Sequence, residues 1–129
     1  MSSAIDITPM VPEGTPIISA YGGGQFRVGS TVYQGSIIAL PDQVIECSLS
    51  FDDNFNGNML QPVIEATDKI DLLVVGCGES FHVPPKDLRS ALKEHNIILE
   101  WMDTGAACRT FNVLLAEGRR VAAALIVTE

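Results

Sequence analysis

Features that would place the chain outside a reducing cytoplasm are scarce in its sequence. Its 129 residues contain three cysteines and no CxxC pair, so neither a disulfide framework nor a zinc site is predicted. The longest unbroken apolar run, Val121 to Val127, is far shorter than the ~18 residues that a membrane-spanning helix needs. The first residues show no basic region followed by an apolar stretch, so we predict neither a secretory signal nor a mitochondrial presequence. We therefore expect a cytoplasmic protein without direct membrane insertion.

Positive charge is also scarce. Eight Lys and Arg stand against 16 Asp and Glu, which gives a net charge of −8, and Arg27 is the one base in residues 1–68. Such a surface repels a phosphate backbone, so the sequence predicts no nucleic-acid partner. The same charge disfavours unaided adsorption to an anionic membrane. The charge allows binding to a basic protein surface, although an acidic face more often serves only solubility.

Residues that hold metals or cofactors do not occur at the spacing that these groups require. His82 and His95 stand apart from the cysteines and acids, so they form no ligand pair. The acidic stretch from Asp52 to Asn58 lacks the downstream Glu of a calcium loop and is better interpreted as a solvated turn. Gly76 and Gly78 lack the third glycine of a dinucleotide-binding motif. We expect no metal and no cofactor.

The residues that are present predict a folded domain. A hydrophobic fraction of 47% can build a core, and the length fits a single domain over residues 1–129. Residues 1–16 contain several prolines and are expected to form an irregular lead-in. In residues 17–50, short apolar or β-branched runs alternate with turn residues. The connections between these runs are too short for parallel crossovers, so antiparallel strands are predicted.

Residues 58–127 predict the order α-β-α-β-α-β. Apolar residues recur at helical spacing near Val63, Leu88 and Phe111, and continuous apolar runs typical of buried strands lie between them. We expect Asp103 or Thr104 to cap the third helix and Gly118 to end it. The predicted fold class is therefore α/β, with a mixed sheet flanked by helices and an N-terminal antiparallel β-layer. One buried cluster is expected to comprise Leu73, Val75, Leu99, Phe111, Leu114 and Leu125.

The candidate binding residues follow the carboxyl ends of the first two buried strands. In open α/β sheets, ligands bind in the crevice where such connections meet. Glycines there allow a close approach to backbone amides, and an arginine can engage a carboxylate or phosphate by two parallel hydrogen bonds. We expect one small polar pocket for a ligand or partner, formed by Gly76, Cys77, Gly78, Thr104, Arg109 and Asn112.

Structural roles are open for the same residues. Arg109 can neutralise Glu100, Asp103 or a carbonyl at the end of the sheet, and Asn112 can hold a loop in place. Cys77 is interpreted as a buried inert thiol, because the sequence shows no base positioned beside it. No catalytic residue is assigned.

The second half of the sequence also contains a series of motifs that resemble those of a known protein family. They are Leu72–Gly78, Pro84-Pro85, Glu100–Thr104, Ala107–Leu114 and Glu117–Leu125. With them the sequence resembles domain of unknown function 498, the family of mitochondrial complex I assembly factor 3 and of the adipogenesis-associated domain protein. The resemblance implies a three-layer α/β domain with a mixed central sheet and an accessory β-layer. It also implies an antiparallel last strand, whereas a simple β-α-β repeat makes that strand parallel.

The same resemblance carries the functional expectation. Family members are not established enzymes, and the mitochondrial ones act in respiratory complex I biogenesis. Cys77 stands where the family often has Thr, and together with the missing presequence this indicates a prokaryotic cytoplasmic member. We predict a non-enzymatic accessory protein that binds a protein partner, such as a respiratory-complex subunit, in complex assembly or membrane-protein biogenesis. The alternatives are a small-molecule (anion) binder or enzyme that uses the pocket, and a metabolic-regulatory domain whose acidic half only aids solubility.

Overall fold

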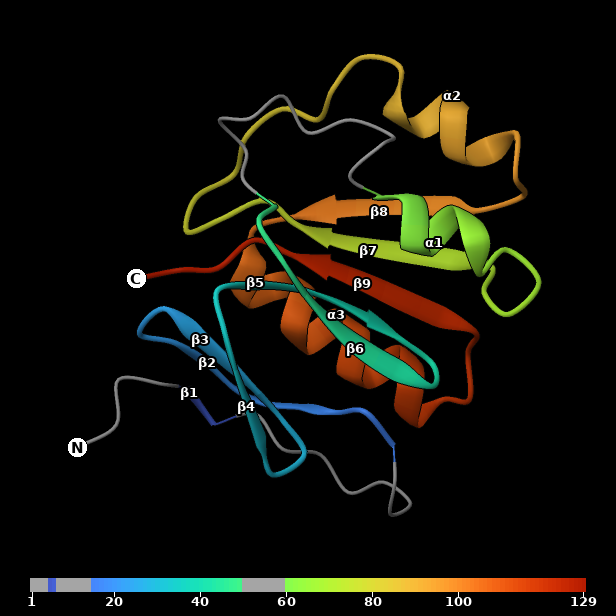
Figure 1. Cartoon of the computed structure of the whole chain (residues 1–129). Coiled ribbons are helices and arrows are strands. Elements are labelled where there is room, and N and C mark those ends of the chain that lie inside the picture. Colours follow the sequence, from blue (N-terminus) through green and yellow to red (C-terminus); the bar gives the residue numbers. More distant parts are fainter. Residues whose placement is uncertain (1–4, 7–14, 50–59) are drawn as a thin grey trace.

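The computed structural model describes residues 5–6, 15–49 and 60–129, which form two sheets and three helices (Figure 1). The accessory sheet is antiparallel and has the strand order β1 (Ile5–Asp6), β2 (Ile18–Gly22), β3 (Gln25–Val28) and β4 (Thr31–Gln34). The central sheet has the order β6 (Gln43–Cys47), β5 (Ser36–Leu40), β9 (Val121–Leu125), β7 (Leu72–Gly76) and β8 (Ile98–Met102).

The central sheet is mixed, which confirms the predicted fold class. Strands β7, β8 and β9 run parallel to one another, while β5 is antiparallel to both β6 and β9. The antiparallel last strand implied by the family resemblance is therefore wrong with respect to β7, because Leu72 pairs with Val121 in parallel register. The helix between β8 and β9 returns the chain to the end at which β8 began, as a crossover between parallel strands requires.

The N-terminal strands do not all belong to one layer, as the sequence had suggested for residues 17–50. Strands β2 to β4 lie in the accessory sheet, but β5 and β6 join the central sheet. The chain changes sheets at Gly35, whose φ of +78° is a left-handed conformation that glycine adopts without strain. Every residue of β5 is buried, as expected for a strand covered on both faces, whereas β4 is largely exposed.

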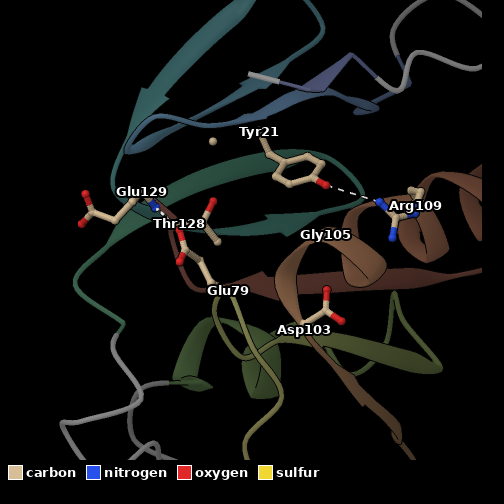
Figure 2. A pocket seen from close by; sticks show the side chains of 8 residues that line it. Tyr21, Glu79, Asp103, Gly105, Arg109, Thr128 and Glu129 are labelled. Carbon is tan, nitrogen blue, oxygen red and sulfur yellow. Dashed lines mark hydrogen bonds between the residues drawn. The ribbon is translucent and has the colours of Figure 1, made fainter. Parts of the chain in front are cut away.

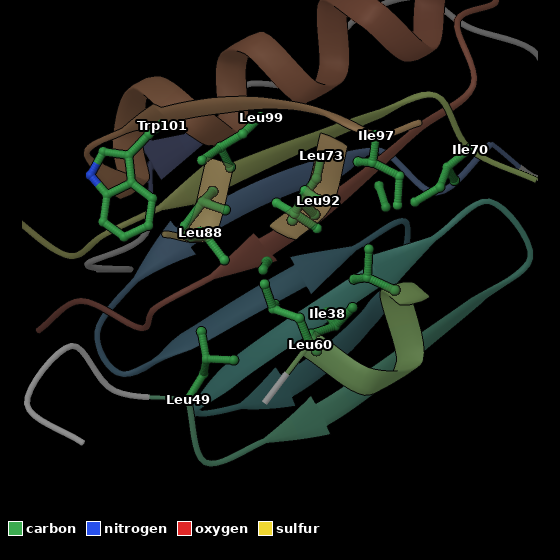
Figure 3. Packing of buried hydrophobic residues seen from close by; sticks show 14 of the residues in the cluster. Ile38, Leu49, Leu60, Ile70, Leu73, Leu88, Leu92, Ile97, Leu99 and Trp101 are labelled. Carbon is green, nitrogen blue, oxygen red and sulfur yellow. The ribbon is translucent and has the colours of Figure 1, made fainter. Parts of the chain in front are cut away.

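Helices cover both faces of the central sheet. On one face, α1 (Gln61–Glu65) and α2 (Leu88–Lys93) pack through Val63, Leu88 and Leu92 (Figure 3). On the other face, α3 (Thr104–Ala116) lies between the central sheet and the accessory sheet, and its Phe111 is fully buried. Because side chains alternate across a strand, the expected single core is divided into two.

The prediction of one cluster is therefore wrong in its membership. Leu73, Val75 and Leu99 belong to the core beneath α1 and α2, whereas Phe111 and Leu125 belong to the core beneath α3. Leu114 packs against the second core and is only partly buried.

The predicted ends of the helices agree with the structure. The Asp103 side chain accepts a hydrogen bond from the Ala106 amide at 2.9 Å and caps α3, and Gly118, with a φ of +77°, follows its end. Pro62 lies in the first turn of α1, where a missing amide hydrogen has no cost. Among the described residues, none of the helices combines the length and the apolar character that a membrane span requires. The Asp52–Asn58 stretch lies outside the described residues.

Candidate functional site

The connections after β7 and β8 meet at the carboxyl edge of the central sheet, and Thr104 joins them. Its amide donates to the Gly78 carbonyl at 2.8 Å, and its hydroxyl accepts from the Gly78 amide at 3.0 Å. The same hydroxyl donates to the Ile126 carbonyl at 2.7 Å. Thr104 is completely buried, so its side chain holds three segments together and does not face a ligand.

Gly76 allows the start of α3 to approach the end of β7. A Cβ atom at this position would lie 2.8 Å from the Thr104 Cα, 2.9 Å from its hydroxyl oxygen and 3.1 Å from the Ala107 Cβ. Two of these atoms belong to the backbone or sit next to it, so they cannot rotate away. Gly76 therefore serves the packing of helix on strand.

We expect Gly76→Ala to lower the free energy of unfolding by about 1–3 kcal/mol, because the added methyl group overpacks the contact between β7 and α3. Denaturant titration measures this change. The substitution should also alter the amide chemical shifts of Gly78 and Thr104, whose mutual hydrogen bonds depend on the position of α3. Unchanged stability would mean that the helix and the strand are farther apart than the structure has them.

Cys77 lies inside the loop that follows β7 and is 1% exposed. Its sulfur accepts a hydrogen bond from the His82 amide at 3.4 Å and lies 3.6 Å from the Ser80 carbonyl oxygen. The thiol therefore shapes the loop from within. The group of His82 that donates to the sulfur is its backbone amide.

Cys108 lies in the core beneath α3, and burial raises its pKa to about 12 from 9.0. The folded state disfavours the thiolate form of Cys108. The neutral thiol therefore contributes fully to the stability of the fold below the unfolded pKa of 9.0, and this contribution is lost as the pH rises toward 12. At about pH 8 we expect iodoacetamide to leave Cys108 unmodified in the native protein and to alkylate it once the protein unfolds. Mass spectrometry after digestion measures this. Rapid native labelling of Cys108 would contradict its placement.

A pocket of about 250 Å³ lies beside the start of α3. Arg109 extends into it from the second turn of the helix, and one of its terminal nitrogens donates to the Tyr21 hydroxyl at 3.3 Å (Figure 2). The residues that line it are Tyr21, Gly22, Glu79, Asp103, Gly105, Arg109, Thr128 and Glu129. The lining therefore comes from β2 of the accessory sheet, from the start of α3 and its cap, and from the segments that follow β7 and β9.

The pocket holds groups of both charges. Among the described residues Arg109 forms no ion pair with Glu100 or Asp103, so its exposed guanidinium keeps donors for another molecule. Asp103 caps α3, and Glu79 accepts from the Glu129 amide at 3.2 Å. The arrangement suits a group that offers a carboxylate to the guanidinium or a cation to the carboxylates. Within the described part of the chain, no group of His, Cys, Asp or Glu is placed to hold a metal ion.

Asn112 does not join this pocket. It is 3% exposed, and its side-chain oxygen accepts from the Ile18 amide at 2.9 Å while its side-chain nitrogen donates to the Ile18 carbonyl at 2.8 Å. Three residues after Arg109, the helix has turned this position toward the accessory sheet. The structure therefore brings Gly76, Gly78 and Thr104 together at the carboxyl edge of the central sheet, but they do not line the pocket. Of the six residues predicted to form it, only Arg109 lines it.

Tyr21 was missed by the sequence reasoning, because 88 positions separate it from its partner Arg109. One local signal existed. Gly105 occupies the first turn of α3, and a Cβ there would lie 2.7 Å from the Tyr21 hydroxyl. A glycine inside a helix costs stability, so its presence indicates that another group approaches closely.

A family model described as "Protein of unknown function (DUF498/DUF598)" matches residues 18–126. The chain belongs to the DUF498/DUF598 family. The matched residues include Tyr21, Glu79, Asp103 and Arg109, whereas Thr128 and Glu129 lie beyond them.

The chain is also similar to individual proteins, two of them compared by sequence and one by structure. An uncharacterised protein of Rhodobacter capsulatus is 35% identical over 109 residues, covering 84% of this chain and 82% of the relative. The Drosophila melanogaster protein named NADH dehydrogenase [ubiquinone] 1 alpha subcomplex assembly factor 3 is 32% identical over 113 residues, 85% of this chain. The chain spans 58% of the length of that assembly factor. The crystal structure of a Bartonella henselae protein, described as an outer membrane protein, has a TM-score of 0.82 and 39% identity, covering 93% of this chain and all of the other.

Proposed function

We propose that this chain is a non-enzymatic accessory factor of the cytoplasm that binds a protein partner during the assembly of a respiratory complex. Similarity to the curated assembly factors carries the proposal. It extends over 85% of this chain in the Drosophila protein and 84% in the human one, at 32% and 28% identity. The family match covers residues 18–126, so it contains the residues that line the pocket apart from Thr128 and Glu129.

The chemistry of the described residues supports a binding role. Cys77 and Cys108 are buried, and the pKa of Cys108 is raised by burial, so neither thiol is poised as a nucleophile. Arg109 is exposed on α3, and its guanidinium donates to the Tyr21 hydroxyl in the pocket. Arginine and tyrosine are the residue types that contribute most to protein interfaces. We take Arg109 as the centre of the partner-binding surface.

Affinity purification from the native host tests the proposal. The tagged chain is expected to co-purify subunits of the NADH-oxidising respiratory complex in amounts that quantitative mass spectrometry can compare with an untagged control. Enrichment of metabolic enzymes alone, with no respiratory subunit above the control, would contradict it.

We expect Arg109→Lys to reduce recovery of that partner by about fivefold or more, since lysine keeps the charge but loses the two parallel hydrogen bonds of guanidinium. Folding should stay intact, because Arg109 is exposed and its one hydrogen bond is long. Arg119→Lys is the matched control on the exposed segment after α3, outside the pocket. A loss of thermal stability with unchanged recovery would assign Arg109 a structural role instead.

A second candidate function rests on the mixed charges of the pocket. Arg109 on one side and three carboxylates around it could hold a small molecule that carries both an anion and a cation, such as an amino acid. A thermal shift with free amino acids, abolished by Arg109→Lys, would favour this function. An unchanged melting temperature across the set favours the protein partner.

A further inference from the structure

A second surface lies away from the pocket, on the connection between β7 and α2. Figure 1 shows this connection arching above β8 before it enters the helix. Phe81 and Val83 lie on it with 61% and 75% of their surface exposed, more than any other large apolar side chains among the described residues. Only His82 separates the two residues in the chain. Clustered exposed apolar side chains mark an interaction site more often than scattered ones do.

The backbone between these two side chains is held in place. The His82 amide donates to the Cys77 sulfur at 3.4 Å, and its carbonyl accepts from the Trp101 indole nitrogen at 2.6 Å. Trp101 is itself part of the core beneath α2. Phe81 and Val83 are therefore presented to solvent by a fixed segment, and little ordering entropy is lost when a partner covers them.

Basic side chains continue the surface along α2. Lys86, Arg89 and Lys93 line a hollow of about 460 Å³ together with Pro84, Pro85 and Ser90. Arg89 and Lys93 lie four residues apart on one side of α2, and Lys86 lies just before the helix begins. Arg89 is also oriented, because one of its terminal nitrogens donates to the Leu99 carbonyl at 2.7 Å.

The charge of this hollow is opposite in sign to the net charge of the chain. Three of the eight Lys and Arg of a chain with net charge −8 line it, and no acid does. The acids nearest in sequence, Asp87 and Glu94, flank α2 at its two caps and are not part of the lining. Asp87 and Glu94 directly follow Lys86 and Lys93 in the chain and reduce the local positive charge, but the three cations that line the hollow outnumber these two acids.

We propose that Phe81, Val83 and the basic hollow of α2 form a docking surface for an acidic segment of a partner protein that carries an apolar or aromatic side chain. Its carboxylates pair with Lys86, Arg89 and Lys93, and its apolar side chain covers Phe81 and Val83. This surface does not depend on the Arg109 pocket or on the proposed role in assembly.

Charge selects this occupant over two others. An anionic membrane would face a whole side of the protein and would be repelled by its net charge of −8. The attraction of the three cations to the membrane, about 1 kcal/mol each, does little against that repulsion. A second copy would bring the same net charge of −8. A short acidic segment avoids both kinds of repulsion, because it contacts only the hollow with its three cations and not the rest of the acidic surface.

Selection of a random peptide display library on the purified chain tests the proposal. We expect the enriched peptides to combine Asp or Glu with a large apolar residue, and to bind Lys93→Glu, Lys86→Glu and Phe81→Ser at least about fivefold more weakly. Arg119→Glu and Val113→Ser are matched controls, since both residues are exposed and lie outside this surface. They should leave binding unchanged, and thermal melts verify that every variant folds.

Three results would overturn the proposal. They are enrichment of basic or charge-free peptides, equal binding of the selected peptides to Lys86→Glu and Lys93→Glu, and loss of self-association or of binding to anionic phosphatidylserine vesicles in these variants while peptide binding persists. Arg109→Lys is expected to keep full peptide binding. The role in assembly and the docking surface on α2 can therefore each fail without the other, and the experiments distinguish the two outcomes.

Discussion

Phe111→Ala is expected to lower the free energy of unfolding by about 3–5 kcal/mol, a large part of the stability of a domain of this size. Phe111 is fully buried in α3, where it contacts the core shared by the accessory and central sheets. Alanine removes the whole ring and leaves a cavity that residues from three layers cannot fill by a local shift. Denaturant titration at equilibrium measures the loss.

Val113→Ala provides the comparison within the same helix. Val113 is 55% exposed two positions after Phe111, so its truncation should change the free energy of unfolding by less than about 0.5 kcal/mol. A loss below about 1 kcal/mol for Phe111→Ala, or equal losses for both, would mean that α3 presents a different face to the sheets.

Asn112→Ala is expected to cost about 2–4 kcal/mol, because it leaves the buried amide and carbonyl of Ile18 without their partner. Both backbone groups lie in β2, so the change should weaken the contact between α3 and the accessory sheet first. Hydrogen exchange measures this as faster exchange of the Ile18 amide. Asn112→Asp retains the acceptor but not the donor, and should also be destabilised. Wild-type stability in both variants would contradict the assigned hydrogen bonds.

Much of the fold was predictable because its signals are local. Asp103 as a cap and Gly118 as a stop each act within one turn of α3, and the continuous apolar runs of β7 and β9 mark strands buried on both faces. Pro62 in the first turn of α1 is a further local signal. Such features depend on a few neighbouring residues and on nothing else in the chain.

The assignment of faces and sheets was not predictable in the same way. Phe111 and Leu99 are both apolar and buried, but they lie in different cores because α3 covers the face of the central sheet opposite to the one on which Leu99 packs. The change of sheets at Gly35 depends on β5 pairing with β9, a strand that follows more than 80 residues later. The site was predicted in part for the same reason: Arg109 was found from its helix, whereas Tyr21 reaches it from another sheet.

We propose that this chain assists the assembly of a respiratory complex by binding a protein partner. The most direct measurement is the amount of fully assembled NADH-oxidising complex, resolved on native gels, in cells from which the gene for this chain has been deleted. We expect the assembled complex to fall and free subassemblies to accumulate, with recovery when the wild-type chain is expressed and weaker recovery with Arg109→Lys. An unchanged amount of assembled complex in the deletion strain would contradict the claim.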